Sequence, residues 1–251
     1  MKILVPIKRV PDPDTKIRLQ PDGAGVASDG VKFSLNPFDA IALEEALRLE
    51  EKLGEMDLVV VSVGGEETIE TLRVGLAMGA KRALLIKTSA DLDSLAVAKI
   101  LAAVYQREQP DFVLMGKQAI DDDSNQVGQM LAALLGIGQA TFVSKLELVE
   151  QHTQARCARE TDAGLETLTV KLPAIITADL RLNEPRYVSL PGIMKAKKKP
   201  LEELELAALG VTAVSRTKIL KYETPPQRQA GVRVKTVDEL VDKLKNEAKA
   251  I

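Results

Sequence analysis

Short apolar runs alternate with longer amphipathic segments through the first half of the chain, and this alternation constrains the fold more than any other feature. The apolar runs lie at residues 3–7, 58–63, 83–86 and 111–115. The amphipathic segments, whose apolar residues recur at helical spacing, lie at residues 36–53, 66–78, 91–106 and 125–135. Strands that alternate with helices of this length form βαβ units with right-handed crossovers. The sequence therefore predicts an α/β fold: an open parallel sheet flanked by helices, Rossmann-like and of the nucleotide-binding kind.

The segment 36–53 shows the helical pattern clearly. Asn36 suits the N-cap, Pro37 suits the first helical position, and Gly54 ends the helix. The apolar positions at helical spacing are Phe38, Ile41, Ala42, Ala46, Leu49 and Leu53. We expect the charged side chains between them to face solvent, namely Glu44, Glu45, Arg48 and Lys52.

From about residue 139 the pattern changes to strands with few helices between them. The strand-like segments lie at residues 141–149, 154–159, 165–172 and 174–178. Asp162-Ala163-Gly164 fits a hairpin turn between the second and the third of these. Residues 181–200 are irregular and basic. Strands are therefore added to the parallel sheet.

The C-terminal part has little visible apolar core. After a Pro225-Pro226 break, a helix is predicted from residue 237 to about residue 249, with Thr236 and Glu239 as its capping box. An extended arm that ends in an amphipathic helix suggests packing on another chain. The predicted regions are an α/β body at 1–184 that includes the β-rich part 139–180, a recognition loop at 185–200, and a C-terminal arm at 201–251.

Composition excludes several classes of function. The 34 basic and 36 acidic residues leave a net charge of −2, which does not favour nucleic acid as a partner. Cys157 and His152 are the only residues of their types, too few for an internal disulfide or a zinc or iron–sulfur site. Neither a signal peptide nor an apolar run long enough to span a bilayer is evident. We expect an intracellular protein without a metal site or direct membrane insertion, cytoplasmic in a bacterium or in the mitochondrial matrix of a eukaryote.

The familiar nucleotide and hydrolase motifs are absent. The chain has no G-x-G-x-x-G fingerprint, and Gly116-Lys117 is followed by Gln118 where a phosphate loop needs Ser or Thr. A single histidine disfavours a hydrolase triad. We therefore predict no catalytic residues.

One loop nevertheless suits a ligand. Residues 116–128 join the carboxyl end of a predicted strand to the start of a helix, which is where ligands bind in open α/β sheets. Small and polar residues at the helix start leave backbone N–H groups free to hold a phosphate. The carboxylates of Asp121, Asp122 and Asp123 would repel an anion, so they fit helix capping or ribose hydroxyls better. On the residues alone the loop is either a nucleotide site or an ordinary capped turn.

Two further segments are candidates. Asn36-Pro37-Phe38-Asp39 alone is a plain helix start, but with the strand ends at Pro6 and Val63-Gly64 it would line the same edge of the sheet. Residues 190–200 combine an apolar stretch, 190–194, with a lysine cluster. An exposed apolar anchor beside basic residues favours a docking element over a merely solvated loop.

Four runs of sequence resemble the beta subunit of electron-transfer flavoproteins. They are NPFDAIALEEALRL at 36–49, GKQAIDDDSNQVGQ at 116–129, GLETLTVKLPAIITADLRLNEPRY at 164–187 and LPGIMKAKKK at 190–199. The resemblance covers essentially the whole chain, and the four runs occur in the same order as in that family.

The resemblance implies a carrier without catalytic activity of its own. In that family the beta subunit pairs with an alpha subunit, around which its tail wraps, and the heterodimer holds one FAD bound mainly by alpha. The carrier accepts electrons from acyl-CoA and related dehydrogenases of fatty acid oxidation. It passes them to a quinone oxidoreductase and so to the respiratory chain. In the common branch, beta also binds a structural AMP.

The resemblance also implies the residues of two sites. The AMP site would comprise Pro6, Asn36, Pro37, Phe38, Asp39, Val63, Gly116, Lys117, Gln118, Ala119, Ile120, Asp121, Asp122, Asp123, Ser124, Asn125, Gln126 and Val127. Within it, the residues at 125–127 would offer backbone N–H groups to the phosphate. The dehydrogenase-docking loop would comprise Leu190, as the apolar anchor, with Pro191, Gly192, Ile193, Met194, Lys195, Ala196, Lys197, Lys198 and Lys199.

Two alternatives remain open from the sequence. A bifurcating relative would bind a second FAD at the nucleotide site and oxidise NADH. A stand-alone nucleotide-binding sensor of the universal-stress type is also compatible with the βαβ pattern, but it leaves the basic loop and the long tail unexplained.

Overall fold

The computed structural model describes residues 1–27, 29–228 and 230–251. Its strands are β1 (Lys2–Pro6), β2 (Arg9–Pro11), β3 (Phe33–Leu35), β4 (Asp57–Gly64), β5 (Arg82–Lys87), β6 (Phe112–Gly116), β7 (Gly138–Val149), β8 (Gln154–Thr161), β9 (Gly164–Lys171), β10 (Ala174–Ala178) and β11 (Leu201–Glu205). Its helices are α1 (Pro37–Leu53), α2 (Thr68–Met78), α3 (Ser94–Glu108), α4 (Val127–Leu135), α5 (Leu190–Ala196), η1 (Leu206–Leu209), α6 (Val237–Asp242) and η2 (Lys243–Glu247).

A single large sheet organises most of the chain. Within the described residues it has nine strands in the order β11-β5-β4-β1-β6-β10-β7-β8-β9. The strands from β11 to β7 are parallel, and β8 and β9 add an antiparallel hairpin at one edge. The predicted α/β fold, with its added strands, is confirmed. The hairpin turn at 162–164 is also where the sequence predicts it, because Thr161 pairs with Gly164.

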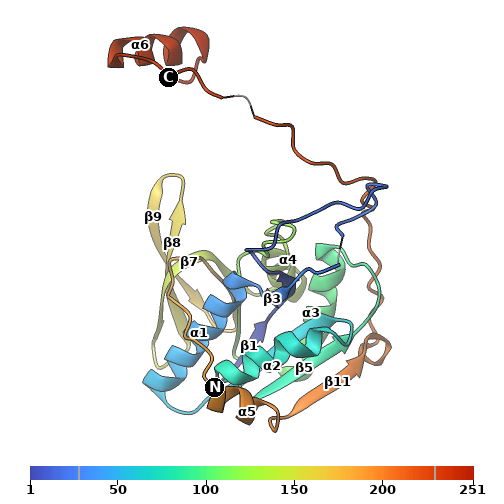
Figure 1. Ribbon diagram of the computed structural model, residues 1–251. Coiled ribbons are helices and arrows are strands. Elements are labelled where there is room, and N and C mark those ends of the chain that lie inside the picture. The colour runs from blue at the N-terminus through green and yellow to red at the C-terminus, as the bar shows by residue number, and fades with distance from the viewer. Residues whose placement is uncertain (28, 229) are drawn as a thin grey trace. The chain divides into compact units, whose positions relative to one another are not determined.

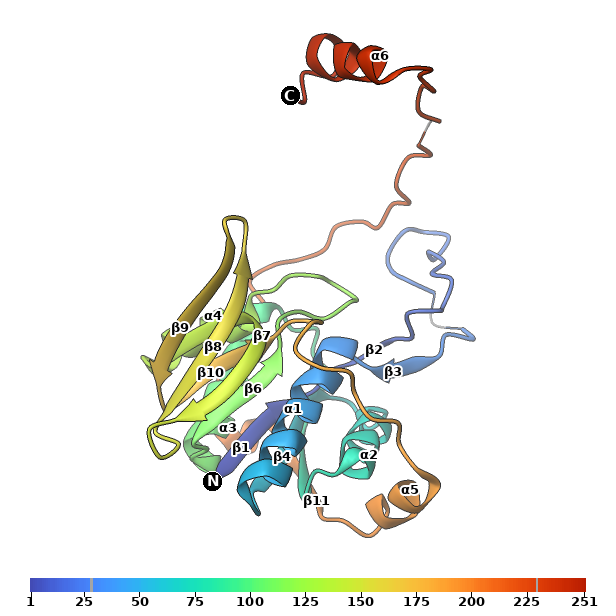
Figure 2. The same cartoon turned by 90° about the vertical axis from the view of Figure 1, so that its left-hand side faces the viewer.

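Helices cover both faces of the parallel part of the sheet. Ile3 and Leu58 point into the cluster that packs on α1 and α2, whereas Leu4 and Val59 point into the cluster that packs on α3 and α4. Successive residues of a strand face opposite sides of a sheet, so a strand buried on both faces must be a continuous apolar run. Figures 1 and 2 show α1 and α2 on one side of the sheet and α3 on the other.

Three local features differ from the sequence-based expectations. Glu44 is buried, with 3% of its surface exposed, although its position on α1 predicted a solvent-facing side chain. Residues 190–196, expected to be irregular, form the short helix α5, whose first turn is capped by the Ser189 hydroxyl accepting from the Gly192 N–H at 3.2 Å. Residues 201–205 form β11, which pairs in parallel with β5, an edge strand that the sequence pattern did not reveal.

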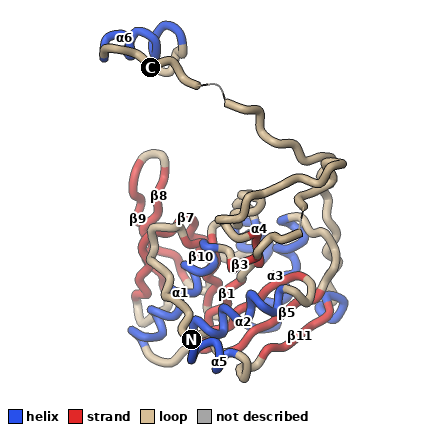
Figure 3. The backbone as a smooth tube through the Cα atoms, in the orientation of Figure 1, coloured by secondary structure: helices blue, strands red, loops and turns tan. Residues whose placement is uncertain are grey.

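The chain divides into two compact units. The first comprises residues 1–17 and 28–219, and the second comprises residues 18–27 and 220–251. In the second unit, Figure 3 draws the described residues between 220 and α6 as loop. The predicted cap of α6 is confirmed, because the Thr236 hydroxyl accepts from the Glu239 N–H at 3.2 Å. The second bond of the capping box differs by one residue from the expected one: the Glu239 carboxylate accepts from the Lys235 N–H at 2.9 Å, instead of from the N–H of Thr236.

No helix among the described residues is both long and apolar enough to cross a membrane.

Candidate functional site

A cavity of about 270 Å³ lies at the carboxyl edge of the parallel strands. The ends of β1, β4 and β6 form its floor, and the start of α4 closes one side. Such a crevice forms at the carboxyl ends of neighbouring parallel strands when the connections that follow them pass to opposite faces of the sheet, so its position follows from the topology.

Most of the residues assigned to the nucleotide site meet in this cavity. Those that line it are Pro6, Asn36, Asp39, Val63, Gly116, Lys117, Gln118, Ala119, Asp122, Ser124, Asn125, Gln126 and Val127. Pro37, Phe38, Ile120, Asp121 and Asp123 lie beside these residues in the chain but not on the cavity wall. Four strand or helix ends that are up to about a hundred residues apart in sequence therefore converge on one pocket.

Asp39 ties two of the strand ends together. Its carboxylate accepts from the Lys8 N–H at 2.8 Å and from the Gly116 N–H at 3.1 Å. Burial raises the pKa of Asp39 to about 7, although these two backbone donors act to lower it. Gly116 must lack a side chain here, since an added Cβ would lie 2.8 Å from the carbonyl carbon of Phe38.

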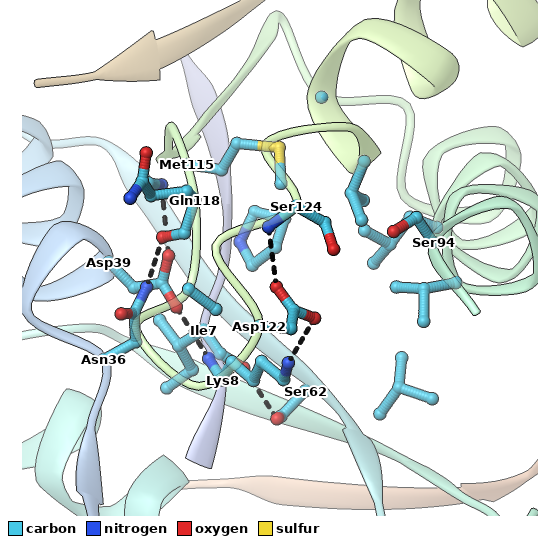
Figure 4. Close-up of a pocket in the computed structure, with 18 of the residues that line it drawn as sticks. Ile7, Lys8, Asn36, Asp39, Ser62, Ser94, Met115, Gln118, Asp122 and Ser124 are labelled. Carbon is cyan, nitrogen blue, oxygen red and sulfur yellow. Dashed lines mark hydrogen bonds and ion pairs between the residues drawn. The ribbon is translucent and has the colours of Figure 1, made fainter. Parts of the chain in front are cut away.

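Asn36 holds the loop that follows β6 instead of capping α1. No side-chain cap bond forms at the start of α1, where Asn36 was expected to supply one. Its amide nitrogen donates to the carbonyl of Gln118 at 2.9 Å, and its amide oxygen accepts from the Ile120 N–H at 3.3 Å. Figure 4 shows Asn36 directed at the backbone beside Gln118. Because both its amide nitrogen and its amide oxygen bond to the backbone of the loop, Asn36 fixes the loop against the start of α1.

The negative charge of the acidic loop is partly balanced within the chain. The Lys8 ammonium lies 2.8 Å from the Asp121 carboxylate and 3.2 Å from that of Asp122 (Figure 4). Burial opposes the charge on Asp122, but the Ser124 N–H and Lys8 hold the pKa of Asp122 below its ordinary value. Asp123 accepts from the Gln118 amide at 2.7 Å. The single positive charge of Lys8 therefore offsets part of the repulsion that the three carboxylates would exert on an anion.

Lys8 was missed by the sequence reading. It lies two residues after Pro6, and residues two apart on an extended chain share a side, which is the signal that could have indicated it. Burial alone would lower the pKa of the Lys8 ammonium, but Asp121 and Asp122 together raise it by more, so the net shift of the pKa is upward.

The start of α4 offers free donors to the cavity. Among the described residues, no acceptor is found for the N–H groups of Asn125, Gln126 and Val127. The first N–H groups of any helix lack partners within the helix, and the aligned peptide dipoles there favour an anion. Gly128, in the first turn, packs closely: an added Cβ would lie 2.7 Å from the Thr177 methyl.

The opposite wall was not predicted and is largely apolar. It comes from the segment that leads into α3, from α3 itself and from the sheet, and its side chains are Val61, Leu92, Val97, Leu101 and Met115. Thr88 and Ser94 add hydroxyls, and Figure 4 places Ser94 across the cavity from Asp39. The cavity thus joins a polar half with free N–H donors to an apolar half, which suits a flat base joined to a phosphate.

Lys117 is committed to internal contacts. Its ammonium lies 2.7 Å from the Asp179 carboxylate, and 5.3 Å and 5.2 Å from the ring centres of Phe38 and Phe142. It therefore orders the base of the loop.

The assigned docking residues form a separate surface. Leu190 is 79% exposed, Met194 63% and Ile193 43%, whereas Ala196 is buried. Pro191, Lys195, Lys197 and Lys198 are also exposed, and Gly192 is half-buried. Lys199 differs from the other lysines, because its ammonium donates to the carbonyls of Leu76 and Ala80 at 2.9 and 2.7 Å.

Comparison with known proteins assigns the family. Residues 24–209 match the electron transfer flavoprotein domain. The chain is 57% identical over 248 residues to the electron transfer flavoprotein subunit beta of Bradyrhizobium diazoefficiens, covering 99% of both chains. The chain belongs to the electron transfer flavoprotein family.

Relatives from eukaryotes agree over the full length. The mitochondrial electron transfer flavoprotein subunit beta of Arabidopsis thaliana is 53% identical over 251 residues, with all of both chains covered. The human electron transfer flavoprotein subunit beta is 50% identical over 249 residues, covering 98% of this chain and 97% of the human one. The resemblance found in the sequence to electron-transfer flavoprotein beta subunits is thus confirmed. As a beta subunit of a flavoprotein, the chain acts in electron transfer and has a partner subunit.

Proposed function

We propose that this chain is the AMP-binding subunit of a heterodimeric electron carrier. The carrier takes electrons from acyl-CoA and related dehydrogenases through an FAD held mainly by the alpha subunit. It passes them to a quinone oxidoreductase, in the bacterial cytoplasm or the mitochondrial matrix. The chain by itself has no turnover. Docking of the dehydrogenase is assigned to residues 190–199, which carry the exposed apolar side chains of α5.

One observation carries the AMP assignment: the free N–H groups at 125–127 open into a cavity whose other half is apolar. A phosphate fits the helix start, and a purine fits the wall of Val61, Leu101 and Met115. The Lys8 ion pairs offset part of the charge of the nearby carboxylates, which weakens the main electrostatic objection to an anion.

The size of the cavity favours a mononucleotide over a second FAD. Small-molecule sites in proteins span roughly 300–1,000 Å³. The cavity, at about 270 Å³, lies just below that range. This supports the carrier with structural AMP over the bifurcating alternative, in which a dinucleotide would occupy the same site.

The flavin would supply the redox chemistry, since it can take up and release electrons singly or in pairs. This chain contributes scaffold and recognition. Its one cysteine is buried in the sheet, and burial raises the pKa of the Cys157 thiol to about 12, so a reactive thiolate does not form at neutral pH.

The test is to co-express the chain with its alpha subunit, denature the purified complex and quantify the released nucleotides by chromatography. One FAD and one AMP per heterodimer is the expected result. Two FAD and no AMP would identify the bifurcating type. Failure to form a heterodimer at all would contradict the proposal and favour a stand-alone nucleotide sensor.

A further inference from the structure

Helix α5 presents its apolar side chains outward and is too short to persist alone. Leu190 and Met194 are exposed, and Ala196 is the buried residue of the helix. Isolated helices shorter than about 12–15 residues are marginal in water, and this one has seven residues. The conformation of the docking segment must therefore be imposed by contacts outside the helix.

The first set of contacts lies just before α5. The Arg186 guanidinium donates to both oxygens of the Glu44 carboxylate, at 2.7 Å from Nε and 3.1 Å from Nη2, and its backbone N–H donates to the same carboxylate at 3.2 Å. Nη1 also donates to Glu51 at 2.7 Å. Both glutamates belong to α1. Two parallel bonds between a guanidinium and a carboxylate fix orientation as well as distance.

This pair is ionised and well supported. Burial would raise the pKa of Glu44, but Arg186 and Arg48 hold it below its ordinary value. Arg48 also donates to the Glu184 carbonyl at 2.9 Å, and the Asn183 amide donates to the Ile41 carbonyl at 3.0 Å. The chain from 183 to 186 is thus bound to α1 at several points.

The second set of contacts lies at the other end of α5. Arg73 of α2 donates to the carbonyls of Ala196 and Lys199, at 2.6 and 3.0 Å. The Lys199 ammonium donates in return to carbonyls at the end of α2, where a cation is favoured by the helix dipole. In Figures 1 and 2, α5 lies beside α2.

We infer that Arg186 and Arg73 are positioning residues that hold the docking segment 190–199 rigid at both ends, so that Leu190 and Met194 are presented ready for a dehydrogenase. The inference rests on the proposed docking function. Ordering a loop at an interface costs free energy for each side chain that is immobilised, so a segment ordered in advance binds more tightly. These arginines need not touch the dehydrogenase to affect its binding.

The test compares variants of the purified heterodimer as electron acceptor for an acyl-CoA dehydrogenase. Arg186→Met and Arg73→Met release one end each, and Arg73→Met leaves no buried carboxylate unpaired, so it remains informative if Arg186→Met assembles poorly. Arg181→Met is the matched control, because Arg181 is 71% exposed at its side chain and pairs with Glu160 on β8, not with α1. Leu190→Ala tests the docking function itself.

We expect each release variant to raise the KM for the heterodimer about tenfold, with kcat at saturation within about twofold and FAD content unchanged. Hydrogen exchange at the amides of residues 190–199 should accelerate about tenfold in the release variants and stay unchanged in Arg181→Met. Leu190→Ala should raise KM without changing exchange.

Two results would overturn the inference: an unchanged KM in both release variants, or a raised KM without faster exchange at 190–199. A Leu190→Ala variant that docks as well as the wild type would instead contradict the proposed docking function. The two failures are therefore distinguishable.

Discussion

At the scale of single residues, Asp39 shows how one buried side chain can assemble a site. Its carboxylate joins the ends of β1 and β6 through the N–H groups of Lys8 and Gly116. Burial raises its pKa to about 7, well above the 3.8 of an exposed aspartate. Between these two values the folded protein binds a proton at Asp39 and the unfolded chain does not.

This difference predicts a pH-dependent stability. Because the folded pKa is the higher one, the contribution of Asp39 is fully present below about pH 4 and is lost as the pH rises through about 7. We expect the wild type to lose stability relative to Asp39→Asn between about pH 4 and pH 7, by at most about 1.4 kcal/mol per pH unit, and the difference to level off above that range. Urea unfolding of both proteins at several pH values measures this difference. A difference that stays constant across the range would show that Asp39 does not titrate there.

At the scale of elements, the geometry of a helix start gives α4 the free N–H donors that a phosphate ligand would need. Its N–H groups lack acceptors among the described residues, and Gln126, just before the first helical residue, is exposed at the rim of the cavity. The field that would hold a phosphate there equally favours a carboxylate side chain.

The substitution Gln126→Glu distinguishes the effect of a carboxylate on the stability of the helix from its effect on the binding of a phosphate. A carboxylate at a helix start stabilises the helix by about 0.3–1 kcal/mol, so the melting temperature should not fall. The same charge repels a phosphate, and we expect the affinity for AMP to fall at least about tenfold, measured by equilibrium dialysis of the nucleotide-free heterodimer. Gln106→Glu, near the carboxyl end of α3, is the matched control and should bind AMP as the wild type does. Undiminished AMP binding by Gln126→Glu would show that the phosphate does not bind at the start of α4.

At the scale of the whole molecule, the two units differ in how they are held together. The first contains both apolar clusters of the sheet, whereas no described residue of the second, at 18–27 and 220–251, is buried. Leu220, Val232 and Val237 are 88%, 77% and 74% exposed. Exposed apolar residues along an extended segment are typical of a surface that a partner covers.

We therefore expect the second unit to be protected by the alpha subunit. In the isolated chain, trypsin should cut first between residues 220 and 236, where Lys221, Arg228 and Arg233 are exposed. In the heterodimer, cleavage there should be at least about tenfold slower, while cleavage at exposed lysines of the body is unchanged. Equal rates in the two samples would argue against an arm that packs on the partner.

The sequence by itself determined the alternation of strands and helices that builds the parallel sheet and the loop at the start of α4, but it did not reveal β11 or the short helix α5. The alternation and the loop follow from periodicity and turn residues, which are local: a buried strand must be apolar throughout, and an amphipathic helix must repeat its apolar face. The sequence also allowed the family to be identified, because four runs of residues match that family in the same order.

Only the tertiary structure decided the partners of the charged residues. Periodicity placed Glu44 in solvent, but Arg186, distant in sequence, pairs with it and so binds the chain before α5 to α1. In the same way, Lys8 forms an ion pair with Asp121, which lies more than a hundred residues further along the chain, and β11 pairs with the edge of β5. A local pattern reports which face a residue occupies on its own element. Which distant group comes to that face is set by the way the whole chain packs.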